Sequence, residues 1–196
     1  MKEIIFATNN AHKLKELRAI VGDSIKLLSL SDIGCHDDIP EDADTLEGNA
    51  LAKARWVHAR YGGACIADDT GLEVDALGGA PGVHTARYAG PGHDPAANMA
   101  KLLNAMAGVE DGERTARFRT VIAYIDATGA EHTFEGAVEG SILSQPRGTE
   151  GFGYDPVFMP EGWTQSFAEA GADAKNAISH RARATKAFTD FLKTQP

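Results

Sequence analysis

Residues 3–22 read EIIFATNNAHKLKELRAIVG and predict a strand, a turn and a helix in direct succession. The first five of these residues form an apolar run typical of a buried strand. Leu14, Leu17, Ile20 and Val21 then recur at helical spacing, and Gly22 ends the pattern. This order of elements is typical of an α/β fold.

The rest of the chain extends this pattern. Strands are predicted over residues 25–30, 64–67, 116–125 and 131–138, and helices over 45–61, 95–106 and from near Ser179 onward. Asp44 and Glu47 form a capping-box pattern before the first of these helices, and residues 126–129 predict a hairpin. Residues 71–95 are rich in glycine and proline, which predicts a long functional loop. We therefore expect an α/β fold with an antiparallel part.

The composition excludes several classes of protein. Lys and Arg number 19 and Asp and Glu 28, a net charge of −9, which argues against a nucleic-acid polymer as partner because a duplex binder needs a basic footprint. Cys35 and Cys65 belong to no CxxC pair, so reduced, buried thiols are expected rather than a zinc site. No apolar run approaches the ~20 residues that span a bilayer, and no signal-peptide pattern precedes the first polar turn. We expect a cytoplasmic protein with no membrane partner.

A phosphate site is predicted at the start of the first helix. It consists of Thr8, Asn9, Asn10, Ala11, His12 and Lys13. A turn between a strand and a helix directs backbone N–H groups to one point, and the helix dipole adds positive charge there. The same residues also fit an ordinary helix N-cap with a surface lysine, and no GxxxxGK[ST] motif is present.

Two adjacent acids, Asp68 and Asp69, follow the apolar strand predicted over 64–67. Ligands gather at the carboxyl ends of strands in open α/β sheets. Neighbouring carboxylates repel each other, so a bound cation favours the ionised form of both, and such hard oxygen ligands suit Mg²⁺. The alternative is a solvated turn rich in Asp.

The acidic loop before residue 45 supplies a further acid, Glu41. Asn49 and Lys53 share one face of the following helix because they are four residues apart. The glutamate and the lysine would flank a metal–phosphate centre. Taken alone, Lys53 is expected on a solvated face, as most lysines are.

Two motifs in the last quarter of the chain predict recognition of a base. In GFGYDP (residues 151–156) an aromatic ring stands between glycines and near a carboxylate, and aromatic faces stack on bases. In KNAISHR (residues 175–181) Lys175, His180 and Arg181 offer donors that suit a purine carbonyl edge or phosphate oxygens. The plain alternatives are a turn with a core Phe and a basic surface.

Together these motifs resemble the inosine triphosphate pyrophosphatase family (Ham1/RdgB-like). The resemblance covers nearly the whole chain and rests on TNNAHK, the spacing of Glu41, Thr45 and Asn49, IADDTGLEVDALGGAPGVHTARYAG, GFGYDP and KNAISHR. Thr70 stands where the family commonly has Ser, and Ala174 where it usually has an acidic residue.

The resemblance implies a single domain over residues 1–196, with an elongated mixed sheet, flanking helices and two lobes around a nucleotide-binding cleft. It also implies a homodimer, Mg²⁺ as cofactor and hydrolysis of ITP, dITP and XTP to the monophosphate and pyrophosphate. Asp69 would be the catalytic proton acceptor and, with Glu41, a metal ligand. The substrate would be bound by Thr8, Asn9, Asn10, Ala11, His12, Lys13, Thr70, Phe152, Gly153, Tyr154, Asp155, Lys175, His180 and Arg181.

Two other functions fit part of the pattern. A Maf-like pyrophosphatase would act on pyrimidine or modified nucleotides, and a nucleotide sensor would bind without catalysis. The presence of both Glu41 and Asp69 disfavours the sensor. The residues themselves indicate a metal and a triphosphate, whereas the preference for a purine rests mainly on the resemblance at GFGYDP and KNAISHR.

Overall fold

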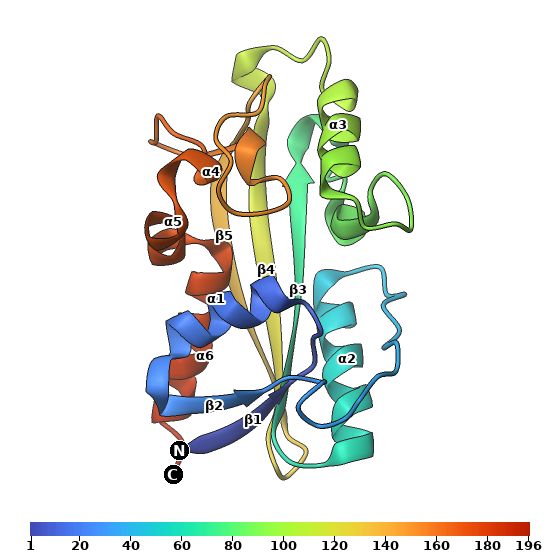
Figure 1. Cartoon of the computed structure of the whole chain (residues 1–196), viewed down its shortest axis with the longest axis vertical. Coiled ribbons are helices and arrows are strands. Elements are labelled where there is room, and N and C mark those ends of the chain that lie inside the picture. Colours follow the sequence, from blue (N-terminus) through green and yellow to red (C-terminus); the bar gives the residue numbers. More distant parts are fainter. The chain divides into compact units, whose positions relative to one another are not determined.

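The computed structural model describes all residues 1–196 and contains one six-stranded sheet with flanking helices (Figure 1). The strands are β1 (Lys2–Phe6), β2 (Ile25–Leu28), β3 (Cys65–Val74), β4 (Thr115–Ile125), β5 (Glu131–Ile142) and β6 (Phe158–Pro160). The helices are α1 (Ala11–Val21), α2 (Leu46–Tyr61), α3 (Pro95–Ala105), α4 (Phe167–Ala170), α5 (Ala172–Ile178) and α6 (His180–Lys193). No helix is both long enough and apolar enough to cross a membrane.

The strand order in the sheet is β2-β1-β3-β4-β5-β6. Strand β1 pairs in parallel with β2 and with β3, whereas β5 and β6 pair antiparallel. The turn between β4 and β5 is closed by bonds between Asp126 and Gly129 and between Asp126 and Ala130, which confirms the predicted hairpin. The mixed sheet with flanking helices confirms the predicted fold class.

The chain divides into two compact units. Unit 1 comprises Met1–Asp69, Thr120–Gly136 and Arg181–Pro196, and unit 2 comprises Thr70–Arg119 and Ala137–His180. Strands β3, β4 and β5 therefore contribute residues to both units. Each unit has a hydrophobic core of its own.

The core of unit 1 joins α1, α6 and the parallel strands. Leu17 and Val21 of α1 lie in one buried cluster with Phe6 of β1 and with Phe188 and Leu192 of α6. Figure 1 shows α1 and α6 together on one side of β1 and α2 on the other side. The prediction of a helix from near Ser179 onward is confirmed by α6, and the C-terminal half of this helix packs into the core.

The core of unit 2 is built around three aromatic rings. The ring centroid of Phe158 lies 4.6 Å from that of Phe118 and 5.3 Å from that of Phe167. Position 140 in β5 is glycine because a Cβ there would meet the carbonyl oxygen of Met159 at 2.4 Å. This close approach lets the short strand β6 lie against β5.

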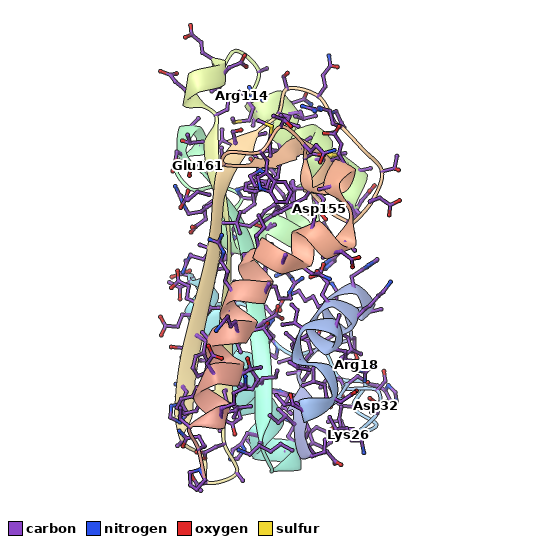
Figure 2. All side chains as sticks on the ribbon, turned by 90° about the vertical axis from the view of Figure 1, so that its left-hand side faces the viewer. Arg18, Lys26, Asp32, Arg114, Asp155 and Glu161 are labelled. Atoms are coloured by element: carbon purple, nitrogen blue, oxygen red, sulfur yellow. The ribbon has the colours of Figure 1, made fainter.

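A buried arginine ties the end of α3 to the end of β5. Arg114, labelled in Figure 2, is 6% exposed, and its guanidinium donates to four carbonyl oxygens. They belong to Met106, Val109, Ile142 and Leu143. These bonds hold the segment after α3 and the end of β5 together.

The structure corrects several local predictions. Strand β3 does not end before Asp68 and Asp69 but continues to Val74, because Leu72 and Val74 are fully buried in the unit 2 core. The long loop therefore begins after Val74, and it contains 3₁₀ turns over Asp75–Leu77 and Gly82–Arg87.

The cap of α2 also differs from the prediction. Thr45, not Asp44, is the N-cap, and its hydroxyl accepts a bond from the backbone N of Gly48 at 3.0 Å. Strand β5 extends four residues beyond the predicted end at Val138. The short elements β6, α4 and α5 were not predicted.

Candidate active site

In unit 1 the two adjacent acids of β3 lie in different surroundings. Asp68 and Asp69 are 3% and 9% exposed, and neighbouring side chains of a strand point to opposite faces of the sheet. Asp68 contacts lysine and arginine side chains, whereas Asp69 accepts a bond from an asparagine. The alternative of a solvated turn rich in Asp is therefore wrong, because both acids are buried and β3 continues through them to Val74.

Asp68 is surrounded by cations. Lys13 Nζ lies 3.2 Å from its Oδ1, and Arg181 Nε lies 3.5 Å from its Oδ2. Arg181 is 2% exposed and also forms an ion pair with Glu16 of α1. Burial opposes ionisation of Asp68, but Lys13, Arg181 and Lys53 outweigh it and lower the pKa of this carboxyl to about 2. Asp68 therefore serves to hold two cationic side chains in place.

Asp69 accepts a hydrogen bond from an asparagine of α2. The amide Nδ2 of Asn49 donates to its Oδ2 at 3.1 Å. Burial raises the pKa of Asp69 above its ordinary value, although Lys53, Lys13 and the bond from Asn49 oppose this change. Asn49 thus holds a buried carboxylate that also interacts electrostatically with Lys53 and Lys13.

Lys53 links the acidic loop to β3. Its Nζ lies 2.6 Å from Glu41 Oε1 and 2.6 Å from the carbonyl oxygen of Asp68. The residue is 6% exposed, so the expectation of a solvated lysine is wrong. Burial disfavours its charge, but Asp68, Glu41 and Asp69 outweigh this penalty and raise the pKa of Lys53. The sequence places Asn49 and Lys53 on one face of α2 and predicts Lys53 beside Glu41, but it assigns Asn49 no role of its own.

The donor set of unit 1 fits a magnesium ion. Glu41 and Asp69 interact electrostatically, and their oxygens are the hard ligands that Mg²⁺ prefers. No group of three or more His, Cys, Asp or Glu side chains is arranged to hold a metal. This is compatible with Mg²⁺, which is commonly held by one or two carboxylates and takes its other ligands from water and phosphate oxygens.

The turn before α1 is a well-formed N-cap. Asn10 Oδ1 accepts from the backbone N of His12 at 3.0 Å and of Lys13 at 3.1 Å, and Thr8 Oγ1 accepts from the backbone N of Asn10. Asn9 and Ala11 are exposed. Two of the N–H groups predicted to face a phosphate are thus engaged by Asn10, which leaves Lys13 and the helix dipole as the main sources of positive charge.

In unit 2 a buried ion pair lies beside the GFGYDP loop. Lys175 Nζ lies 2.8 Å from Asp155 Oδ2, and both side chains are about nine-tenths buried or more. The same oxygen accepts from the backbone N of Phe152 at 3.1 Å. Figure 2 labels Asp155, which folds back over its own loop. Asp155 thereby orients Lys175, and position 174 needs no acid for that purpose.

The glycine at position 151 makes this arrangement possible. Its φ is +76°, and a Cβ there would lie 2.2 Å from Asp155 Oδ2. The carboxylate therefore occupies the space that any side chain at 151 would need. Lys175 Nζ also lies 4.9 Å from the ring centroid of Phe152, a cation–π distance, and Phe152 is half-buried.

The remaining predicted residues of unit 2 differ in their surroundings. Tyr154 is buried, and its hydroxyl donates to the carbonyl of Thr85 at 2.7 Å, which anchors the loop to the 3₁₀ turn Gly82–Arg87. His180 is 3% exposed and stacks on Phe118 with ring centroids 4.8 Å apart. Gly153 adopts a φ of +62°, and Thr70 is half-buried in β3.

A family model described as the Ham1 family matches residues 4–191. The chain belongs to the Ham1 family. Within that family, it is 59% identical to a dITP/XTP pyrophosphatase of Porphyromonas gingivalis over 98% of both chains. It is 46% identical to a dITP/XTP pyrophosphatase of Bacillus subtilis, again over 98% of both chains.

Solved structures of the Ham1 family share the fold. The Ham1 protein of Coxiella burnetii matches with a TM-score of 0.90 and 37% identity over 100% of both chains. The Ham1 protein of Staphylococcus aureus matches with a TM-score of 0.89 and 35% identity over 98% of both chains. The mixed sheet and its helices are therefore a property of the family.

Proposed function

We propose that this chain hydrolyses the non-standard purine nucleoside triphosphates dITP, ITP and XTP to the monophosphate and pyrophosphate. The names of its relatives support this activity. The observation that carries the proposal is the arrangement around β3 in unit 1, where the buried carboxylate of Asp69 lies next to an acid that holds Lys13 and Arg181. This arrangement supports the proposal that a proton acceptor and phosphate-binding cations lie in one unit.

The proposed reaction is attack of water on the α-phosphorus. Asp69 accepts a proton from that water, the new P–O bond forms, and the bond to the bridging oxygen breaks as pyrophosphate leaves. Water and the triphosphate thus give the monophosphate, pyrophosphate and one proton. No covalent bond to the protein is needed in this reaction. Neither cysteine is therefore assigned a role as nucleophile, and both are buried.

Lys13 and Arg181 are proposed to bind the triphosphate. Their charges would offset the charge that develops on the phosphate oxygens, which is the main source of catalysis in phosphoryl transfer. Asp68 fixes both side chains before substrate arrives. Glu16 restrains Arg181 further, and because it lies on α1 it links this cation to the turn at Thr8 to Lys13.

Glu41 and Asp69 are proposed to hold Mg²⁺. A bound Mg²⁺ neutralises phosphate charge and stabilises the departing pyrophosphate. Lys53 sets the position of Glu41 through the 2.6 Å bond to Oε1, so the two proposed ligands are held by different residues of α2.

Residues of unit 2 are proposed to bind the base. The ring of Phe152 offers a stacking surface, and Lys175 offers a donor to the 6-oxo group of hypoxanthine or xanthine. The 6-amino group of adenine is itself a donor, so Lys175 would find no acceptor at that position. This disfavours ATP and dATP. The bond from Lys175 to Asp155 supports this proposal, because it fixes the position of the proposed donor.

The experiment that tests this function is a release assay for pyrophosphate across ITP, dITP, XTP, ATP, dTTP and UTP, with and without Mg²⁺. We expect release from the first three that depends on Mg²⁺. Release mainly from dTTP or UTP would indicate a Maf-like specificity instead. Tight binding of ITP without product would indicate a nucleotide sensor.

Gly151→Ala is expected to damage selectivity more than turnover. A Cβ at 151 displaces the Asp155 carboxylate, which frees Lys175 from its partner. We expect the ratio of kcat/KM for dITP to that for dATP to fall about tenfold, the effect of roughly 1.4 kcal/mol. Gly162→Ala is the control, because Gly162 also has a positive φ of +80° but has no atom within 4 Å of an added Cβ. An unchanged ratio in Gly151→Ala would contradict the role of the Asp155–Lys175 pair.

We further propose a homodimer in the cytoplasm, as the family resemblance implies. Elution of the purified chain at the mass of two copies would support the dimer.

A further inference from the structure

Asn49 of α2 makes two hydrogen bonds in unit 1, one with an acid of β3 and one with the acidic loop. Its Nδ2 donates to Asp69 Oδ2 at 3.1 Å, and its Oδ1 accepts from the backbone N of Ala43 at 2.9 Å. The residue is 3% exposed. Ala43 lies two residues after Glu41 in the acidic loop. One side chain amide therefore joins the proposed proton acceptor to the segment that carries the other proposed metal ligand.

The chemistry of the two partners permits only one orientation of this amide. A backbone N–H is a donor and must face the amide oxygen, whereas a carboxylate is an acceptor and must face the amide nitrogen. Only asparagine offers both groups on a side chain of this length. Aspartate at this position would still accept the bond from Ala43 but would repel Asp69. Alanine would form neither hydrogen bond.

The acidic loop also packs closely on the first turn of α2. A Cβ at Gly48 would meet the Cβ of Ala43 and the Oγ1 of Thr45, each at 2.9 Å. The loop therefore approaches the helix so closely that position 48 has no room for a side chain. This contact and the bond that the Ala43 N–H donates to Asn49 both fix the backbone at Ala43.

We propose that Asn49 is a positioning residue that aligns Asp69 and the Glu41 loop for metal binding and water attack. This inference rests on the proposed function, because it takes Asp69 as proton acceptor and Glu41 and Asp69 as metal ligands. Residues that hydrogen-bond to metal ligands orient them, and their loss commonly lowers metal affinity or activity by about 10–100-fold.

A matched asparagine in unit 2 provides the control. Asn98 of α3 is also 3% exposed, accepts from the backbone N of Ala89 at 2.7 Å and donates to the carbonyl of Ala86 at 2.9 Å. It holds a loop to a helix as Asn49 does, but it contacts no carboxylate. Asn98→Ala therefore measures what the loss of a buried loop-to-helix asparagine does to the fold alone.

The test compares Asn49→Ala, Asn49→Asp and Asn98→Ala with the wild-type chain. For Asn49→Ala we expect kcat for dITP to fall about 10–100-fold with KM within about threefold, and Mn²⁺ binding without nucleotide, measured by electron paramagnetic resonance, to weaken about 10–100-fold. For Asn49→Asp, which keeps the Ala43 contact and nearly the same shape, we expect a similar loss of kcat. Only kcat is compared for this variant, since an added carboxylate can itself bind a cation.

The outcomes separate the possible roles. If Asn98→Ala lowers the unfolding temperature but keeps wild-type kcat and Mn²⁺ affinity, the losses in Asn49→Ala belong to positioning. Wild-type kcat and Mn²⁺ affinity in Asn49→Ala, or equal losses in Asn98→Ala, would overturn the proposal. If the wild-type chain releases no pyrophosphate, the proposed function fails, while the comparison of Mn²⁺ binding still tests the role of Asn49 in aligning Glu41 and Asp69.

Discussion

Asp69→Asn is expected to lower kcat for dITP by roughly 10²–10⁴-fold, the usual contribution of a general base. The amide has nearly the shape of the carboxylate and can still accept the bond from Asn49, so the fold should be retained. The loss should therefore appear in turnover and not in the unfolding temperature. Initial rates of pyrophosphate release at saturating Mg²⁺, together with a thermal melt, measure both quantities.

Asp75→Asn serves as the control for this substitution. Asp75 follows the same strand, and its partners are Thr115 and Arg117 of β4, neither of which belongs to the proposed site. We expect wild-type kcat from this variant. Pyrophosphate release by Asp69→Asn at the wild-type rate would remove Asp69 from the mechanism.

Lys53→Met is expected to have the largest effect on stability. Its ammonium group lies among Glu41, Asp68 and Asp69, and its side chain is 8% exposed. Removing one partner of a buried ion pair leaves an uncompensated charge, which lowers the free energy of unfolding by about 3–5 kcal/mol. Urea denaturation followed by circular dichroism measures this change. Mg²⁺ should restore part of the loss, because a cation bound to Glu41 and Asp69 stabilises the folded state.

Lys26→Met is the matched control for the lysine substitution. Lys26, labelled in Figure 2, pairs with Glu3 at 3.1 Å, but both side chains are more than half exposed. Exposed pairs contribute little to stability, so the urea midpoint should barely change. Equal midpoints for Lys53→Met and Lys26→Met would show that the Lys53 contacts do not stabilise the fold.

Much of the fold follows from local patterns in the sequence. The strand, turn and helix over residues 3–22 are as predicted, because the apolar run, the helical spacing and the terminal glycine agree. The exception is β3, where Asp68-Asp69-Thr70-Gly71 has the composition of a turn but lies within a strand. Its two acids can be buried because cationic side chains contact Asp68 and an amide donates a hydrogen bond to Asp69. These partners come from distant parts of the chain.

Residues of the candidate site also depend on contacts between distant parts of the chain, which local sequence patterns do not show. Lys53 was expected on a solvated face, since a lysine is buried only where carboxylates surround it, and no local pattern shows that Asp68 and Glu41 converge on it. Asn49 was noted only for its spacing from Lys53. Its bonds to Asp69 and Ala43 depend on how α2 packs against β3 and the acidic loop. The short elements β6, α4 and α5 carry too few residues for a periodic pattern.

The most direct test of the mechanism is turnover of dITP in water enriched in ¹⁸O. Attack of water on the α-phosphorus with Asp69 as proton acceptor predicts that the label enters the phosphate of the monophosphate and that the released pyrophosphate carries none. Mass spectrometry of the two products distinguishes them. Label in the pyrophosphate, or release of inorganic phosphate in its place, would contradict the proposed reaction.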